Sequence, residues 1–207
     1  GSENSLKLKQ PAQAEGKRMK FLGMEKVRDG KYLKNYELSY ENKSGKLKKF
    51  EIVSRKELAG PEELGKRVSG VSIVAFCDGK MLLLEEFRLS INKRIFNLCA
   101  GMTEAGESVE ECIKRELYEE TGLSVKRIIR ILPPSYSAVG FSDTKTYIAF
   151  VEAEGEFCDH TSDNEEITAR FYSREEVRKL LETAEFSSRS QMAAFYFCGG
   201  MEELPGS

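Results

Sequence analysis

The chain has 207 residues, which is enough for one well-buried domain and a small additional unit. With 32 basic and 34 acidic residues its formal charge is −2, so it lacks the basic character typical of proteins that bind long polyanions. The only histidine, His160, argues against a histidine-based catalytic triad. The five cysteines show no CxxC spacing, which favours reduced thiols over disulfides or a zinc site. No apolar run approaches the ~20 residues of a membrane span. The reduced thiols lead us to expect a cytoplasmic protein.

The N-terminal part is predicted to hold a small sheet. Residues 1–18 are polar, and we expect a mobile tail there, followed by an antiparallel β subdomain over residues 19–58. Three strands alone are too few to be stable, so this sheet must pack on the rest of the chain or on a second copy. The candidate strands are Phe21–Val27, Tyr32–Tyr40 and Leu47–Val53.

The second predicted domain covers residues 68–207 and mixes strands with helices. Asp78-Gly79 is a hairpin signal between its first two strands. The irregular alternation of strands and helices favours an α/β sandwich around a mixed sheet. The predicted strands are 71–77, 80–87, 95–99, 125–132, 145–152 and 167–172, and the later helices follow Ser173 and cover 188–197.

The most informative segment is a helix that follows Ser108. Ser108 and Glu111 have the spacing of a capping box, and Gly122 stands where a helix would end. At about 100° per residue, an apolar stripe runs along this helix, with Glu116 and Glu120 inside it and Glu119 on its edge. The apolar members of the stripe are Val109, Cys112, Ile113 and Leu117.

Carboxylates that face a core are costly unless they are protonated, paired or bound to a metal. Arg115 is placed to pair with Glu119 at i,i+4, but one guanidinium cannot neutralise three acids. Divalent cations such as Mg²⁺ prefer hard oxygen ligands and would supply the missing charge. The alternative is an ordinary solvated acidic face, which the position of the acids within the stripe disfavours.

The stretch from Gly101 to Leu123 resembles the signature of the Nudix hydrolase family. This resemblance implies a Nudix hydrolase domain over residues 68–207, built as an α/β/α sandwich, and a Mg²⁺-dependent pyrophosphohydrolase in which Mn²⁺ can substitute. It implies that Glu116, Glu120 and the carbonyl of Ala100 bind metal, and that Glu119 binds metal or orients water. The matching positions are Gly101, Glu107, Arg115, Glu116, Leu117, Glu119, Glu120, Gly122 and Leu123.

Outside the signature, residues 19–182 resemble the ADP-ribose pyrophosphatase branch of the family. The element Glu86-Phe87-Arg88 implies that Arg88 contacts phosphate, and Arg55 is similar to an arginine presented from the N-terminal sheet. Tyr32 and Phe50 fall where the branch places aromatics that sandwich the nucleobase. The branch usually exchanges this sheet between two subunits, which implies a homodimer. The plainer alternative is that these are ordinary sheet residues and solvated arginines.

A late acidic segment, Ser162–Ile167, is similar to a loop of this branch in which one acid binds metal and another activates water. Glu165 matches the metal position and Asp163 the base, with Glu166 as the second candidate for these roles. A solvated acidic turn is the alternative.

Two departures from the branch pattern leave the substrate open. Asn97-Leu98-Cys99-Ala100-Gly101 replaces the usual Glu-aliphatic-Pro-Ala-Gly, and the loop 137–142 lacks a proline. We predict hydrolysis of ADP-ribose, a nucleoside diphosphate derivative, to AMP and ribose 5-phosphate. The alternatives are another nucleotide sugar such as GDP-mannose, free nucleoside triphosphates, or a non-catalytic nucleotide-binding regulatory domain. We expect a small-molecule substrate and no nucleic-acid or membrane partner.

Overall fold

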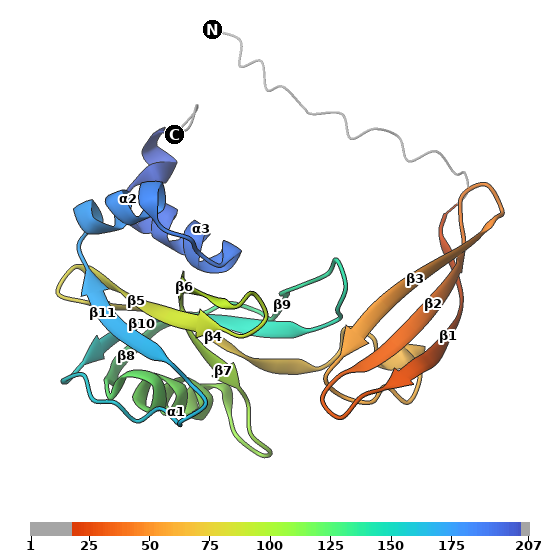
Figure 1. Cartoon of the computed structure of the whole chain (residues 1–207), viewed down its shortest axis with the longest axis horizontal. Coiled ribbons are helices and arrows are strands. Elements are labelled where there is room, and N and C mark those ends of the chain that lie inside the picture. Colours follow the sequence, from red (N-terminus) through yellow and green to blue (C-terminus); the bar gives the residue numbers. More distant parts are fainter. Residues whose placement is uncertain (1–17, 204–207) are drawn as a thin grey trace, which may run out of the picture. The chain divides into compact units, whose positions relative to one another are not determined.

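The computed structural model describes residues 18–203, which divide into two compact units (Figure 1). The first unit contains the described residues up to Leu64 together with Ala138–Asp143. The second contains Gly65–Ser137 and the described residues from Thr144 onward. Residues 1–17, which make up most of the predicted tail, lie outside the described range.

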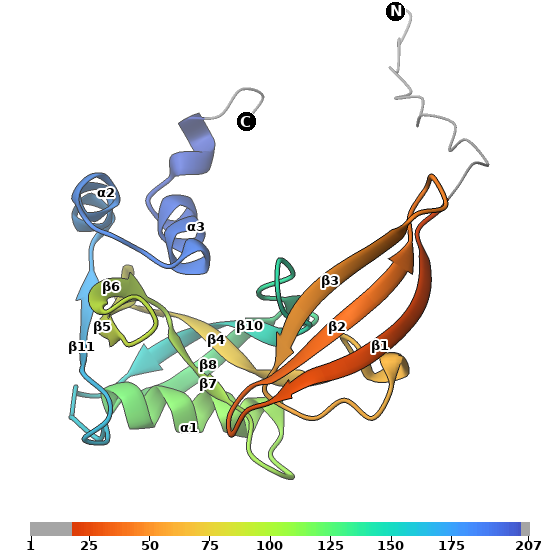
Figure 2. The ribbon, with the colours of Figure 1, turned by 45° about the vertical axis from the view of Figure 1, so that its right-hand side comes forward.

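The first unit is built on an antiparallel sheet of three strands in the order β1-β2-β3 (Figure 2). Its small core contains Tyr36, Leu38, Ile52 and Leu58, and the backbone N–H of Leu58 donates a 2.7 Å hydrogen bond to the Tyr36 hydroxyl. The predicted three-stranded sheet is therefore confirmed. The strands are β1 (Lys20–Asp29), β2 (Lys34–Glu41) and β3 (Leu47–Ser54), followed by a short 3₁₀ helix, η1 (Pro61–Glu63).

The second unit contains an eight-stranded mixed sheet whose central path is β11-β5-β4-β10-β8. β4 and β10 are parallel, whereas the other pairs are antiparallel. The strands are β4 (Val68–Cys77), β5 (Lys80–Arg88), β6 (Lys93–Asn97), β7 (Cys99–Met102), β8 (Ser124–Ile131), β9 (Ser135–Tyr136), β10 (Lys145–Glu154) and β11 (Ile167–Tyr172).

This sheet splits into two limbs beyond the β4–β5 hairpin. The two strands pair at Phe76↔Met81 and Cys77↔Lys80, and from there β5 pairs with β6 while β4 pairs with β7. We call β11, β5 and β6 the β5 limb, and β7, β4, β10 and β8 the β4 limb. The predicted single strand over 95–99 is therefore wrong in one respect, because the chain crosses between the limbs at Leu98. The crossing places Ala100 and Gly101 alongside β4.

Helices cover both faces of this sheet, so the second unit has three layers (Figure 1). Residues Ile113 and Leu117 of α1 (Val109–Thr121) are fully buried against one face. The opposite face packs on α2 (Arg174–Thr183) and α3 (Ser188–Phe197), and η2 (Gly200–Glu203) follows. The predicted α/β/α architecture is confirmed. Within residues 18–203, none of the helices has the length and apolar character needed to cross a membrane.

Candidate active site

The helix α1 turns two of its glutamates toward the sheet. The capping box of Ser108 and Glu111 starts the helix, and Gly122 ends it in the left-handed conformation at φ 79°. Glu116 is 8% exposed and Glu120 is partly buried, whereas Glu119 is exposed. The predicted inward orientation of Glu116 and Glu120 is therefore confirmed, with Glu119 at the solvent edge.

The strand β7 presents its backbone to both inward carboxylates. A Cβ added at Gly101 would lie 1.9 Å from Cδ of Glu116, so the carboxyl group occupies the space of the missing side chain. The N–H of Ala100 donates a 3.1 Å hydrogen bond to Oε2 of Glu120. Register with β4, in which Ser72 pairs with Ala100, holds this backbone in place. The peptide of Ala100 thus lies beside Glu120, and metal binding by its carbonyl stays a prediction.

Arg115 joins the signature loop to α1. Its Nε and Nη2 donate to the two carboxylate oxygens of Glu107 at 2.7 and 3.0 Å, and Nη2 also donates to the Met102 carbonyl at 2.8 Å. Nη1 donates to Glu116 at 2.7 Å and to Glu119 at 3.0 Å. The hydrogen bonds from Arg115 lower the pKa of Glu107 to about 2. This bidentate pair braces the loop against the helix.

Among residues 18–203, Glu120 has no comparable cationic partner. Burial raises the pKa of its carboxyl group to about 8, and the negative charges of Glu116 and Glu86 add to this effect. The hydrogen bonds from Cys99 and Ala100 act in the opposite direction. Burial also raises the pKa of Glu116, although Arg115 opposes this. In the part of the chain that the structure describes, Glu120 forms no ion pair. An additional cation would therefore favour the ionised form of this pair.

The oxygen donors on α1 and β7 fit a hard divalent cation. Two carboxylates one helical turn apart and a neighbouring backbone carbonyl are ligand types that Mg²⁺ accepts, and Mg²⁺ usually keeps several waters. Across residues 18–203, no three side chains of the His, Cys, Asp or Glu type converge on one point as a ready metal cage. The fit therefore rests on Glu116, Glu120 and the Ala100 peptide.

The acids of the late loop have other partners. Glu165 accepts hydrogen bonds from the N–H and the hydroxyl of Ser162 at 3.2 and 3.1 Å. Glu166 forms an ion pair with Arg94, and Asp163 is exposed. The structure therefore does not bring Glu165 and Asp163 together with the α1 carboxylates, and their roles in metal binding and water activation stay predictions.

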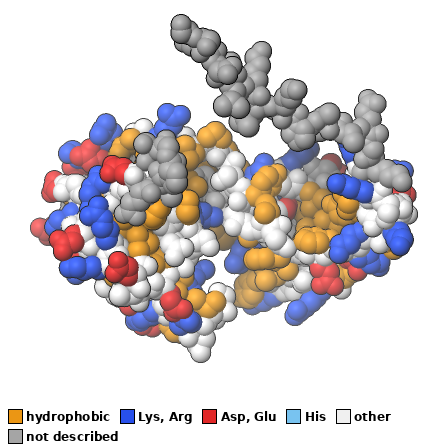
Figure 3. Space-filling model, turned by 90° about the horizontal axis from the view of Figure 1, so that it is seen from above, with side chains coloured by type: hydrophobic (Ala, Val, Ile, Leu, Met, Phe, Trp, Pro, Cys, Tyr) orange, Lys and Arg blue, Asp and Glu red, His pale blue; other side chains and the backbone are white. Residues whose placement is uncertain are grey.

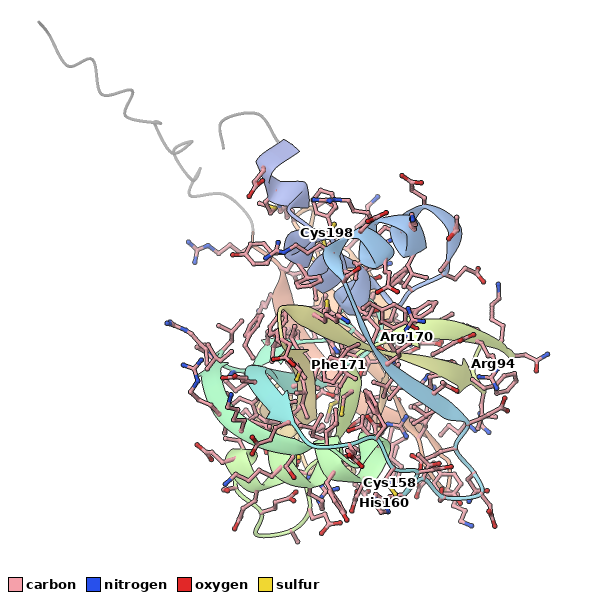
Figure 4. All side chains as sticks on the ribbon, turned by 90° about the vertical axis from the view of Figure 1, so that its left-hand side faces the viewer. Arg94, Cys158, His160, Arg170, Phe171 and Cys198 are labelled. Carbon is pink, nitrogen blue, oxygen red and sulfur yellow. The ribbon has the colours of Figure 1, made fainter. Side chains whose placement is uncertain are left out.

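The same loop is fastened to the C-terminal end of α1 (Figure 4). The ring of His160 stacks on Tyr118, with centroids 4.6 Å apart and planes inclined by 24°. The N–H of Cys158 donates a 2.9 Å hydrogen bond to the carbonyl of Thr121. Loop and helix together border a hollow of about 220 Å³ that Glu120 lines. Its other lining residues are Thr121, Phe157, Cys158, Asp159, Ile167, Thr168 and Ala169.

Arg88, the predicted phosphate contact, is paired within the β5 limb. Its Nη1 donates to Glu86 at 2.6 Å, and the other oxygen of Glu86 accepts from the Asn97 amide at 3.0 Å. The side-chain Oδ1 of Asn97 accepts a hydrogen bond from the hydroxyl of Ser187 at 2.8 Å. From the sequence, Glu86 was named only as part of the Glu86-Phe87-Arg88 element, and Ser187 was missed. The i,i+2 spacing of Glu86 and Arg88 on one strand could have indicated their pairing, whereas Ser187 left no such signal.

The remaining candidates belong to the first unit. Tyr32 is 69% exposed in the turn between β1 and β2, beside a hollow of about 420 Å³. Phe50 is 39% exposed and pairs with Leu38, which lies about 13 Å along the sheet from the Lys34 end at 3.3 Å per residue. Arg55 is exposed after β3. The unit does not bring the two aromatics together, and the substrate roles of all three residues stay predictions.

The part of the chain that contains this site matches a known protein domain. Residues 66–195 match the NUDIX domain, which covers the split sheet, α1 and most of α3. The chain belongs to the Nudix family. The family resemblance is thereby confirmed, and the candidate site on α1 lies within the matched residues. Nudix hydrolases generally use divalent metal ions, in agreement with the donor set on this helix.

The chain is similar in sequence to hydrolases of two kinds within the family. The chain is 31% identical over 134 residues to an ADP-ribose pyrophosphatase of Bacillus subtilis (strain 168), covering 64% of this chain and 65% of the relative. It is 38% identical over 99 residues to an NAD-capped RNA hydrolase NudC of Mycobacterium tuberculosis (strain ATCC 25177 / H37Ra), covering 48% of this chain and 31% of the relative. The chain thus spans less than two thirds of the length of each.

The fold also resembles a solved structure described as an ADP compounds hydrolase. The two superpose with a TM-score of 0.68 at 19% identity, covering 92% of this chain and 97% of that chain. At this identity the likeness shows a shared fold, which includes more of the chain than the NUDIX match alone.

Proposed function

We propose that this Nudix protein hydrolyses the diphosphate bridge of a nucleoside diphosphate linked to another moiety, in a Mg²⁺-dependent reaction. The observation that carries the proposal is the pair Glu116 and Glu120, two inward carboxylates against the β7 backbone, with the Arg115 guanidinium hydrogen-bonded to Glu116. Burying two carboxylates costs free energy unless cations bind beside them.

Hydrolysis adds one water across the P–O–P bridge, breaks one P–O bond and leaves two phosphate monoesters. Bound Mg²⁺ would supply positive charge for the phosphoryl oxygens and would lower the pKa of a water. Glu116, Glu120 and the Ala100 carbonyl would hold the ions, while Arg115 keeps Glu116 oriented. Arg88, already beside Glu86, would contact phosphate from the β5 limb.

The acids that remain would assist at the reacting water. Glu119 is exposed at the edge of the site and held by Arg115, so it would bind a further ion or orient the water. Asp163 and Glu165 would act from the late loop, as base and metal ligand respectively. Since Glu165 is hydrogen-bonded to Ser162, this role requires the Ser162 contacts to be exchanged for contacts at the site.

ADP-ribose is our first candidate substrate, giving AMP and ribose 5-phosphate. The relatives named for ADP-ribose and for NAD-capped RNA support it, because NAD itself contains an ADP-ribose unit. Tyr32 and Phe50 would each offer an exposed ring to the base, from separate places on the first unit. GDP-mannose is the alternative nucleotide sugar. A non-catalytic nucleotide-binding domain is the alternative of another class, and the complete set of signature acids disfavours it.

The test is a product assay on ADP-ribose, NAD, GDP-mannose, nucleoside triphosphates and NAD-capped RNA, each with Mg²⁺ and with EDTA. We expect Mg²⁺-dependent release of AMP from ADP-ribose, lost in Glu120→Gln and kept in Glu110→Gln. Glu110 is the matched control because it is an exposed acid on the same helix. Equal AMP release by wild type and Glu120→Gln at saturating Mg²⁺ would refute the assignment of the site, and binding without turnover would favour the regulatory alternative.

We further propose a cytoplasmic homodimer in which the subdomain 19–58 is exchanged. The surface of the first unit carries exposed apolar side chains, visible in Figure 3, that a second copy would cover. They include Phe21, Leu22, Val27, Leu33, Leu47 and Phe50. Light scattering should give about twice the chain mass of 23.4 kDa. A mass of one chain at micromolar concentration would exclude the dimer.

A further inference from the structure

Arg189 carries a partly buried guanidinium that has no acidic partner within residues 18–203. It lies in the first turn of α3, and its Nη1 donates a 2.8 Å hydrogen bond to the hydroxyl of Ser72, a residue that is 2% exposed. Among the described residues it forms no ion pair, and burial lowers the pKa of its guanidinium without any carboxylate opposing the shift. A buried charge that faces only a neutral hydroxyl is unfavourable, so this place in the fold lacks a counter-charge.

Arg189 spans the split between the two limbs of the sheet. The start of α3 is fixed to the β5 limb, because the N–H of Ser187 and the hydroxyl of Ser190 both donate 3.0 Å hydrogen bonds to the Phe96 carbonyl. From there the Arg189 side chain reaches Ser72 on β4. The guanidinium therefore lies on the face of the sheet that α3 covers, opposite α1 (Figure 1).

One strand separates this guanidinium from the α1 carboxylates. Ser72 pairs with Ala100 across β4 and β7, and paired Cα atoms in an antiparallel ladder are about 5 Å apart. The N–H of Ala100 is hydrogen-bonded to Glu120. The backbone of Ala100 thus has the acidic site on one side and the Ser72–Arg189 pair next to it on β4. One strand pair and two hydrogen bonds therefore link Arg189 to the site around Glu120.

The N-terminus of α3 adds to the positive potential at Arg189. The N-cap residue Ser187 makes no side-chain cap, because its hydroxyl contacts Asn97 and Ser190 instead. Uncapped N–H groups and the helix dipole both favour an anion at such an end, and a guanidinium in the same turn strengthens this preference. Guanidinium, hydroxyl and amide donors together are the donor types that bind phosphate.

We infer that Arg189 and Ser72 form a subsite that binds a phosphate group of the substrate, on the face of the sheet opposite Glu116 and Glu120. The inference rests on the proposed function for the identity of the substrate, but not for the chemistry of the subsite. The phosphate bound there is either part of the diphosphate bridge or a further phosphate on the linked moiety. The second test below distinguishes these two sources. An uncharged sugar would leave the guanidinium without a counter-charge.

The first test measures binding without turnover. Inorganic phosphate is titrated by calorimetry into the full chain in EDTA, for wild type, Arg189→Met, Arg189→Lys and Lys179→Gln. Met keeps the apolar stem and removes the charge, while Lys179 on α2 is an exposed control for the same charge change. We expect Arg189→Met to bind about tenfold more weakly or not at all, Lys to retain partial binding and Lys179→Gln to match wild type. Equal binding by wild type and Arg189→Met, or no binding by wild type, would overturn the subsite.

The second test identifies the source of the phosphate. KM and kcat are compared for ADP-ribose and for ADP-ribose carrying a phosphate on its terminal ribose. A rise in KM of Arg189→Met for both substrates assigns the diphosphate, and a rise for the phosphorylated substrate alone assigns the additional phosphate. Unchanged KM for both would contradict the subsite. If wild type hydrolyses neither substrate, the proposed function fails, while the phosphate titration still decides the subsite. Should Arg189→Met fold poorly by circular dichroism, Ser72→Ala provides the second variant, with the same weakened binding expected.

Discussion

Gly101 and Glu116 lie so close together that no side chain fits between them. A Cβ at residue 101 would be 1.9 Å from the carboxyl carbon of Glu116, which is itself only 8% exposed. The glycine is needed here for space, because the strand β7 passes directly over the inward carboxylate. The position of Glu116, and with it the donor set of the site, therefore depends on the absence of a side chain on β7.

Gly101→Ala should displace the Glu116 carboxylate or shift β7. We expect a loss of about 1–3 kcal/mol in the free energy of unfolding from overpacking, and a fall in kcat of about 100-fold or more. Gly23→Ala on β1 is the control, since a Cβ there meets no atom within 4 Å. Denaturant unfolding and steady-state kinetics give both quantities. Full activity in Gly101→Ala would show that the carboxylate is not required where the structure places it.

Glu107 should contribute to stability in a way that depends on pH. Its hydrogen bonds with Arg115 lower its pKa from 4.5 to about 2 in the folded chain. A lowered pKa stabilises the fold above the unfolded-state pKa, and the contribution is lost as pH falls from about 4.5 toward 2. The difference in Tm between wild type and Glu107→Gln should be constant from pH 7 to 5 and shrink below that range. A difference that grows on acidification would contradict the pairing.

The Tyr118–His160 stack should hold the late acidic loop against α1. Tyr118 is half exposed, so removing the stack should change global stability little while loosening the loop that carries Asp163 and Glu165. We expect His160→Ala to lower kcat about tenfold and to speed hydrogen exchange in residues 158–166, and His160→Phe to restore both by keeping an aromatic ring. If His160→Phe is as impaired as His160→Ala, the stacking is not the relevant contact.

The thiols should differ sharply in reactivity. Cys158 is exposed, whereas Cys99, Cys112 and Cys198 are buried. Burial raises the pKa of Cys112 to about 12 and that of Cys99 well above its usual range, which leaves almost no thiolate on either near neutral pH. Iodoacetamide at pH 8, followed by mass spectrometry, should label Cys158 first. Early labelling of Cys112 in the folded chain would contradict the packing of α1.

Local patterns predicted α1 and the strands because the determinants are close in sequence. Ser108 and Glu111 form the expected capping box, and the inward position of Glu116 follows from four neighbouring residues of one helix. The crossing at Leu98 could not be predicted in this way, since Asn97 and Cys99 belong to strands on different limbs and the segment reads as one extended run.

Contacts between distant residues left no periodic mark in the sequence. Ser187 and Asn97 are 90 residues apart, and Arg189 and Ser72 are 117 apart. The late loop shows a different limit. Its acids were predicted as site residues from their type and position. In the structure, however, Glu165 accepts a hydrogen bond from Ser162, three residues away. Residue type and spacing identify the candidate acids of a site. The fold determines which groups each of these acids contacts.

The central claim is that Glu116 and Glu120 face inward because divalent cations bind beside them. Its most direct test is anomalous diffraction from crystals of wild type and of Glu120→Gln soaked in Mn²⁺. We expect an anomalous peak within coordination distance, about 2.2 Å, of a carboxylate oxygen of Glu116 or Glu120 in wild type, and a weaker or absent peak in the variant. No peak beside these carboxylates at millimolar Mn²⁺ would contradict the account.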